Sequence, residues 1–103
     1  MILFYGSEIC IDCRYTLAIL KARNLEDKFR FIDMTANTDN MKDFLTLRDR
    51  EAAFAPAREG ANGRSFIGIP AFVNEDGKVT LDLDQALAWL GQPAVKEEEI
   101  VEK

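Results

Sequence analysis

The chain has 103 residues, of which 48% are hydrophobic and 30% charged, so it has room for one domain with a real core and none for a second. A formal net charge of -5 argues against nucleic acid and anionic membranes as partners. The absence of histidine excludes an imidazole base, a Ser-His triad and a histidine metal ligand.

The hydrophobic residues give no sign of a membrane or export segment. No apolar run approaches the roughly 20 residues that a membrane-spanning helix needs. The run from Met1 to Tyr5 is also too short for the hydrophobic region of a signal peptide. We therefore expect a cytoplasmic protein.

The first third of the chain predicts a strand, a helix and a second strand. Ile2 to Tyr5 is a short apolar run that ends at Gly6, as a buried strand followed by a turn does. Apolar residues then recur at helical spacing from 11 to 23, and residues 29–34 are rich in β-formers. A strand-helix-strand unit of this length implies two parallel neighbours joined by a right-handed crossover.

The middle of the chain predicts a second helix and an irregular segment. Thr38 or Asp39 can cap a helix that runs to about Arg50 and places one apolar face against the sheet. Residues 51–64 combine alanines with Pro56 and several glycines, which indicates a short helical piece followed by a turn-rich loop.

The last third predicts a hairpin and a final helix. Residues 66–73 resume apolar character, Asn74 to Gly77 reads as a hairpin turn, and residues 79–81 form the returning, antiparallel strand. Asp84 is expected to cap a last helix that runs through Leu90. We expect one domain over residues 1–92 and an acidic tail over residues 93–103.

The strongest chemical signal is the pair Cys10 and Cys13, placed where a strand has ended and a helix begins. The positive end of a helix dipole and its unpaired N–H groups stabilise a thiolate at Cys10, which makes Cys10 the expected nucleophile. Cys13 follows about one helical turn later and can resolve a mixed disulfide on Cys10. The negative charges of Glu8 and Asp12 disfavour a thiolate at Cys10, whereas the positive charge of Arg14 favours it.

Other roles remain open for the two cysteines. They could be buried and inert, or they could bind a metal or an iron-sulfur cluster, since this spacing also serves such sites. Four protein ligands are usual there, and the chain offers two thiolates, so only a dimer could complete the site. A structural disulfide is disfavoured, because a bridge over so short a loop constrains the unfolded chain little.

A second signal is Pro70, which stands at the start of a segment whose other residues favour a strand. Proline cannot donate to a strand ladder and needs an edge, a strand start or a special turn. A cis bond between Ile69 and Pro70 would turn the Ile69 backbone outward as a short edge for an extended substrate. A trans proline that only opens the strand is the alternative.

Together these features resemble the glutaredoxin branch of the thioredoxin superfamily, and the resemblance covers Ile2 to Leu90. In that family the first cysteine attacks, the second resolves, and the residue before a cis proline pairs its backbone with the bound peptide or glutathione. The resemblance thus implies these roles for Cys10, Cys13 and Ile69. It also implies that Asp84 matches the acidic cap that meets a glutathione amine.

The chain departs from that family at three places. Ser7 and Glu8 stand where glutaredoxins usually carry a basic residue, and Leu81-Asp82-Leu83 replaces their Gly-Gly pair. The stretch before the proline is longer, and Arg58 and Arg64 within it are candidates for the lost basic contact. In these respects the chain looks like the glutaredoxin-like redoxins that donate electrons to ribonucleotide reductase and are reduced by thioredoxin reductase.

Pattern and resemblance together imply an α/β thioredoxin fold, with a four-stranded mixed sheet in the order 2-1-3-4 and helices on both faces. We expect a monomeric thiol-disulfide oxidoreductase that reduces protein or mixed disulfides without a bound cofactor or metal. Glutathione or a thioredoxin-reductase-like enzyme is the expected electron donor. The alternative is a binding module that carries a metal or iron-sulfur cluster across a dimer. The expected substrate-binding residues are Ile69, Pro70, Asp84 and Arg64.

Overall fold

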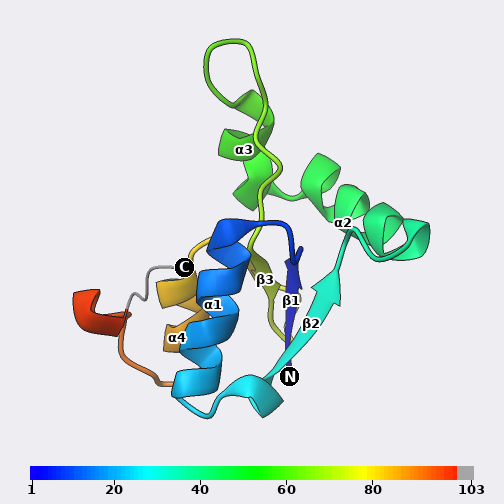
Figure 1. Ribbon diagram of the computed structural model, residues 1–103. Coiled ribbons are helices and arrows are strands. Elements are labelled where there is room, and N and C mark those ends of the chain that lie inside the picture. Colours follow the sequence, from blue (N-terminus) through cyan, green and yellow to red (C-terminus); the bar gives the residue numbers. More distant parts are fainter. Residues whose placement is uncertain (100–103) are drawn as a thin grey trace.

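The computed structural model describes residues 1–99 (Figure 1). Four strands form one mixed sheet in the order β2-β1-β3-β4, which confirms the predicted order. The strand β1 (Ile2–Gly6) runs parallel to β2 (Phe29–Asp33) and antiparallel to β3 (Ala71–Val73), and β3 pairs antiparallel with β4 (Val79–Thr80). The parallel pair is joined through a helix, as the sequence pattern predicts.

Helices cover both faces of the sheet. The helices α1 (Ile11–Ala22) and α4 (Leu83–Trp89) lie on one face, and α2 (Thr38–Arg50) lies on the other (Figure 1). Three short helices complete the fold, and they are η1 (Glu26–Lys28), η2 (Ala52–Phe54) and η3 (Glu97–Glu99). Among residues 1–99, no helix combines the length and the apolar character needed to cross a membrane.

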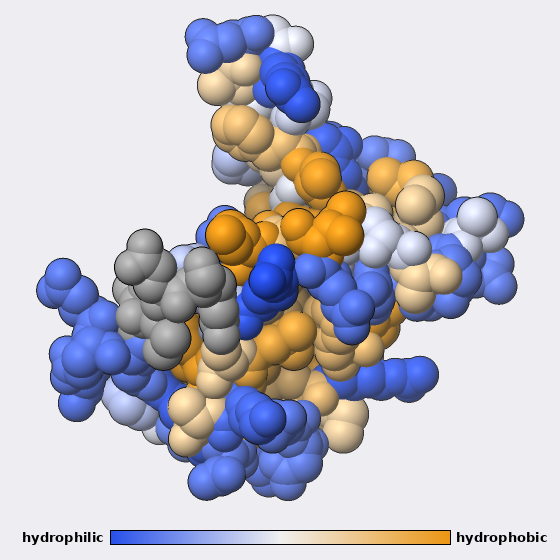
Figure 2. All heavy atoms as spheres, in the orientation of Figure 1, coloured by the Kyte–Doolittle hydropathy of each residue, from blue (hydrophilic) through white to orange (hydrophobic). Residues whose placement is uncertain are grey.

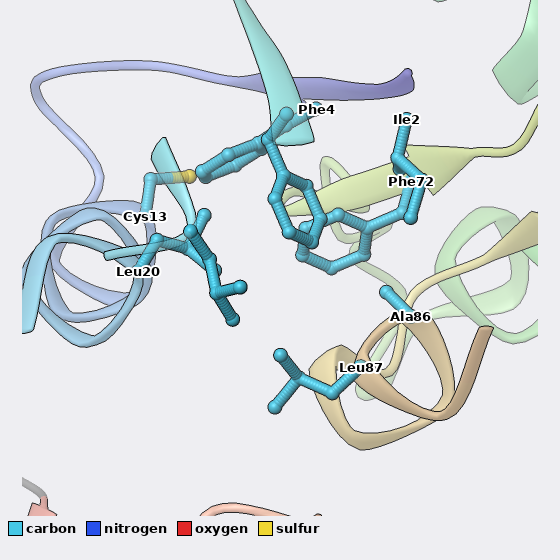
Figure 3. Packing of buried hydrophobic residues seen from close by; sticks show 9 residues of the cluster. Ile2, Phe4, Cys13, Leu20, Phe72, Ala86 and Leu87 are labelled. Carbon is cyan, nitrogen blue, oxygen red and sulfur yellow. The ribbon is translucent and has the colours of Figure 1, made fainter. Parts of the chain in front are cut away.

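The two hydrophobic clusters follow from the alternation of side chains along β1. Ile2 and Phe4 point toward α1 and α4, whereas Leu3 and Tyr5 point toward α2. The Phe4 ring lies 4.9 Å from that of Phe31 and 5.1 Å from that of Phe72, centroid to centroid. In Figure 3, the residues of this cluster converge between the sheet, α1 and α4. The sheet is therefore buried from both sides.

Two helix caps differ from the prediction. The cap of α2 is Asn37, whose Oδ1 accepts a hydrogen bond from the Asn40 N–H at 2.8 Å, in place of Thr38 or Asp39. The cap of α4 is Asp82, whose Oδ1 accepts from the Asp84 N–H at 3.1 Å. The expectation for Asp84 was wrong because the helix begins two residues earlier.

The strand predicted over residues 66–73 is shorter than expected, since only Ala71–Val73 pairs in the sheet. The residues before it belong to an arm that projects beyond the sheet (Figure 1). We define this arm as residues 55–69, and it begins with α3 (Ala55–Glu59). At its tip Ala61 and Arg64 exchange two backbone hydrogen bonds of 2.9 and 3.0 Å.

The segment after α4 packs back on the domain through Arg23. The Arg23 guanidinium donates to the Pro93 and Ala94 carbonyls and to both carboxylate oxygens of Glu99, the latter at 2.7 and 2.6 Å. Val95 packs against the cluster under α1. The expected tail continues to 103, and its last four residues lie outside the described part of the chain.

Candidate functional site: a cysteine pair beside a groove

Cys10 is the N-cap of α1. Its backbone is extended, with φ -92° and ψ 122°, and its Sγ accepts a hydrogen bond from the Cys13 N–H at 3.4 Å. Its own N–H donates to the Ser7 carbonyl at 3.1 Å, which fixes the turn between β1 and the helix. The unpaired N–H groups of a helix start favour negative charge on such an atom. Cys10, which is half-buried, therefore holds its sulfur at the start of a helix, with a backbone donor directed at it.

Cys13 is fully buried one turn further along α1. The pKa of its thiol is raised from 9.0 to about 12, chiefly by burial and then by the hydrogen bond with Cys10, although a backbone hydrogen bond with Ser7 acts to lower it. Both cysteines are free thiols. The Cys13 sulfur points into the hydrophobic cluster (Figure 3). Cys13 therefore stays protonated at neutral pH while Cys10 opens toward solvent.

Gly6 makes room for the Cys13 sulfur. A Cβ at Gly6 would lie 2.9 Å from Cys13 Sγ, 2.9 Å from the Phe4 ring and 3.0 Å from the Phe31 ring. Real Cβ atoms do not come so close, so only glycine fits at this position without a shift of the neighbours. The last residue of β1 thus sets the position of the second sulfur.

A polar network, which sequence reasoning missed, holds the loop before Cys10. The buried Ser7 hydroxyl lies 2.7 Å from that of Thr35, and the Thr35 hydroxyl donates to Asp33 Oδ1 at 2.6 Å. Since the Thr35 proton points to the carboxylate, Ser7 is the donor in the first bond. The Thr35 hydroxyl, with the backbone N–H groups of Thr35 and Glu8, holds the pKa of the Asp33 carboxyl below its usual range.

A signal for this network was present in the sequence. Ser7 follows β1 directly, and Asp33 and Thr35 lie at the end of β2. Because β1 and β2 are parallel, their carboxyl ends meet at the same edge of the sheet. Polar residues after neighbouring parallel strands are thus expected to meet.

A groove of about 640 Å³ opens beside Cys10. One wall comes from the loop before α1 and from Thr35, and the other comes from the arm. The groove brings together three of the predicted residues, namely Cys10, Arg64 and Ile69. The remaining lining residues are Ser7, Ile9, Asp12, Thr35, Ser65, Phe66, Ile67 and Gly68. Figure 2 shows hydrophobic side chains gathered at the base of the projecting arm.

The Ile69–Pro70 peptide bond is cis. The alternative, a trans proline that only opens the strand, is therefore wrong. Ile69 lies in the groove, and Pro70 leads directly into β3. Among the described residues, the backbone groups of Gly68 and Ile69 take part in none of the hydrogen bonds of loops, turns and caps. This part of the groove wall therefore offers unpaired backbone donors and acceptors beside Cys10.

Two residues considered for glutathione binding lie elsewhere. Asp84 does not line the groove, and its carboxylate accepts a hydrogen bond from the Val95 N–H at 2.9 Å. The Arg58 guanidinium donates to the carbonyls of Arg48 and Glu51, the second at 3.0 Å, and so joins the arm to the end of α2. Of the proposed basic contacts, only Arg64 reaches the groove.

In the part of the chain that the structure describes, no three side chains of His, Cys, Asp or Glu come together in a way that could hold a metal ion. Within residues 1–99, the two cysteines thus have no third ligand of these types beside them.

Comparison with known proteins places the chain beside one relative. A protein of Haemophilus influenzae, itself uncharacterized, is 34% identical over 84 residues, which make up 82% of this chain and 90% of the relative. The two belong to one family. At this coverage the Haemophilus relative shares most of the domain and not only a short motif. No protein-family model and no solved structure matches the chain.

Proposed function

We propose that the chain is a thiol-disulfide oxidoreductase with a thioredoxin fold, similar to the glutaredoxins. The observation that carries the proposal is the division between its two sulfurs. Cys10 lies at a helix start and opens into a groove, while Cys13 is buried one turn behind it with a raised pKa. The mixed sheet of order β2-β1-β3-β4 supports the fold assignment.

The first step is an attack by Cys10 on a substrate disulfide. The Cys10 thiolate forms a bond with one substrate sulfur, the substrate S–S bond breaks, and the other substrate sulfur leaves as a thiolate that takes up a proton. The helix start and the Cys13 N–H favour negative charge on Cys10 Sγ before the attack. The product is a mixed disulfide between Cys10 and the substrate.

The second step releases the substrate. Cys13 loses its proton and attacks the Cys10 sulfur, which forms a Cys10–Cys13 disulfide and frees the second substrate thiol. The dithiol thereby gives up two electrons, and the substrate takes up two electrons and two protons. Because the Cys13 thiol is buried and protonated at neutral pH, it does not compete with Cys10 for the first attack.

A second thiol compound must return the two electrons. Glutathione and a dithiol reductase of the thioredoxin-reductase class are the candidates, and a reducing cytoplasm supplies both. In this proposal the protein acts as a monomer, with no bound cofactor. Among the described lining residues of the groove, Arg64 is the only cation and Asp12 the only carboxylate, so the groove gives an anionic tripeptide little net attraction.

The test is a coupled reduction assay with hydroxyethyl disulfide, recycled either by glutathione with its reductase or by thioredoxin reductase. We expect NADPH consumption with at least one donor and none in Cys10→Ser. Cys13→Ser should retain the first step and accumulate a mixed disulfide visible by mass spectrometry. Full dithiol activity in Cys10→Ser would contradict the proposal.

The metal or cluster carrier remains the second candidate to be tested. A freshly purified protein that is a coloured dimer with protected thiols would favour it over the redox function. A colourless protein that loses two titratable thiols under mild oxidation supports the redox function instead. Absorption spectra and thiol counting on the same sample make this comparison.

A further inference from the structure

The exposed hydrophobic side chains are concentrated around the groove. Among residues 1–99, six large hydrophobic side chains are exposed, and four of them line the groove or a second cavity next to it: Ile9, Leu45, Phe66 and Ile67. Ile9 is 83% exposed, and Phe66 and Ile67 are each 56% exposed. Apolar side chains gathered on one face of a soluble domain indicate an interaction site.

The second cavity, of about 250 Å³, lies on the other side of the same segment of the arm. Ser65, Phe66 and Ile67 line both spaces, so this segment separates them. The other lining residues are Met34, Phe44, Leu45 and Arg48, of which three are hydrophobic. An apolar surface thus continues from the Cys10 groove across the arm to α2.

Arg48 holds this segment in place. Its Nε donates to the Ile67 carbonyl at 2.9 Å, and its Nη2 donates to the Phe66 carbonyl. The Phe66 N–H donates to the Ala57 carbonyl at 2.8 Å. With their backbone groups fixed in this way, Phe66 and Ile67 present their side chains to solvent in a formed surface. A preformed surface costs less ordering free energy when a partner binds.

The groove suits one kind of occupant by its chemistry. Because Cys10 is the proposed nucleophile, the occupant must carry a disulfide. The unpaired backbone groups at Gly68 and Ile69 suit an extended chain, which can form hydrogen bonds along this edge. The apolar walls suit bulky hydrophobic side chains on either side of the substrate cysteine. The opposed charges of Arg64 and Asp12 leave no strong attraction for a small polyanion.

We propose that the protein selects polypeptide disulfides whose cysteine is flanked by large apolar residues, which pack on Ile9, Phe66 and Ile67. The backbone of Ile69 pairs with the same segment, as the resemblance to glutaredoxins implies. This inference rests on the proposed function and names its substrate class. The cavity beside α2 takes an apolar side chain further along the same segment. Glutathione disulfide lacks such side chains and is a poor substrate by comparison.

The test compares rates of disulfide reduction by the stoichiometric, fully reduced protein under anaerobic conditions. The probes are symmetric disulfide dimers of two short peptides of equal length and charge, one with Leu and Phe around its cysteine and one with Ser and Asn. Glutathione disulfide and hydroxyethyl disulfide complete the set. The proteins are wild type, the double variant Phe66→Ser and Ile67→Ser, the groove variant Arg64→Ala, and the control Arg50→Ala at an exposed arginine outside both cavities.

We expect wild type to reduce the apolar peptide roughly tenfold faster than the polar one, since one partly buried apolar side chain supplies about that factor. The double variant should lose this preference, and Arg50→Ala should keep it. Hydroxyethyl disulfide, which carries no side chains to pack on Phe66 and Ile67, should be reduced equally by wild type and Arg50→Ala. An unchanged circular dichroism spectrum and thermal transition show that the double variant keeps the fold.

Three results would overturn the inference. Equal rates for the two peptides, with normal reduction of hydroxyethyl disulfide, would refute the substrate class alone. Fastest reduction of glutathione disulfide, lost in Arg64→Ala, would assign the groove to glutathione. A dimer in analytical ultracentrifugation that dissociates in the double variant would assign the surface to a second copy of this chain. Failure of wild type to reduce hydroxyethyl disulfide would instead refute the proposed function itself.

Discussion

The two sides of the groove are built in different ways. The side that carries the cysteines rests on the hydrophobic cluster between β1, α1 and α4, where Cys13 and Phe4 are fully buried. The arm on the other side has its hydrophobic side chains in solvent and is joined to α2 by the guanidinium groups of Arg48 and Arg58. The two cysteines thus lie on a packed core, whereas the exposed apolar surface of the arm is held in place by hydrogen bonds from arginine side chains.

This difference matches the two requirements of the proposed redox function. The distance between two sulfurs must be kept within narrow limits, and close packing sets it because a core tolerates no spare volume. A surface that selects partners needs exposed apolar groups, and these cannot be fixed by burial. Changes under α1 should therefore affect stability and the proposed chemistry together, and changes to the exposed side chains of the arm should affect selectivity more than stability.

The largest effect is expected from Gly6→Ala. The added methyl group would overlap the Cys13 sulfur and the Phe4 and Phe31 rings, and overpacking of this kind costs roughly 1–3 kcal/mol. Thermal unfolding should show a lower Tm, and the mixed disulfide should persist longer because Cys13 is displaced. Combining it with Cys13→Ala should relieve part of the loss in free energy of unfolding. A wild-type Tm in the single variant would show that this part of the core is looser than we infer.

The second effect is a loss of stability at high pH. The Cys13 thiol has a pKa of about 12 when folded, against 9.0 as its ordinary value, so its contribution is complete below pH 9 and is lost as the pH rises from 9 toward 12. Over that window the unfolded chain releases a proton that the folded protein keeps, at about 1.4 kcal/mol per pH unit. Urea unfolding between pH 7 and 11 should show a steeper decline in wild type than in Cys13→Ala. Parallel declines would contradict the assigned pKa.

A third, smaller effect is expected from Arg48→Ala, which tests the arm. Loss of the bonds to the Phe66 and Ile67 carbonyls should speed amide hydrogen exchange in the arm and lower the free energy of unfolding by roughly 1 kcal/mol. Reduction of hydroxyethyl disulfide should not change. The control is Arg50→Ala, an exposed arginine on the same helix. Equal exchange in both variants would show that Arg48 does not hold the arm.

The smallest effect is expected from Asp33→Asn, at the edge where the two sides meet. The amide accepts the Thr35 hydrogen bond less strongly than a carboxylate, so the free energy of unfolding at pH 7 should fall by roughly 0.5–1.5 kcal/mol. Because the folded pKa of Asp33 is lowered, its contribution is present above its ordinary value of 3.8 and is lost as the pH falls further. The difference between wild type and variant should therefore shrink in acid. A constant difference down to low pH would rule out the charge as its source.

The sequence predicted the parts of the fold that depend on local pattern. The apolar run from Ile2 to Tyr5 and the helical spacing from 11 to 23 can be read from neighbouring residues, and so can the position of Cys10 at a helix start. The strand order was predicted from the strand-helix-strand unit and the hairpin, taken together with the resemblance to glutaredoxins, and the structure confirms it. These features needed no knowledge of distant contacts.

The remaining features depend on contacts that the pattern does not contain. Residues 66–70 are as apolar as a strand, yet a side chain at Arg48 takes the carbonyls that a neighbouring strand would otherwise bond. Asp82 and Asp84 are equally good caps by residue type, and only the start of α4 decides between them. The packing of residues 93–99 on Arg23 likewise joins positions far apart in the chain.

The hairpin turn from Asn74 to Gly77 closes the end of the sheet farthest from the cysteines, since β1 and β3 are antiparallel and Val73 pairs with Leu3. At Gly77 φ is +80°, and no neighbouring atom lies within 4 Å of where a Cβ would stand. An inserted peptide tag or surface tether at this turn would therefore hold the molecule by the end opposite the cysteine pair. Anchored there, the protein would present Cys10 and the arm outward, a ready orientation for capturing disulfide partners on a solid support.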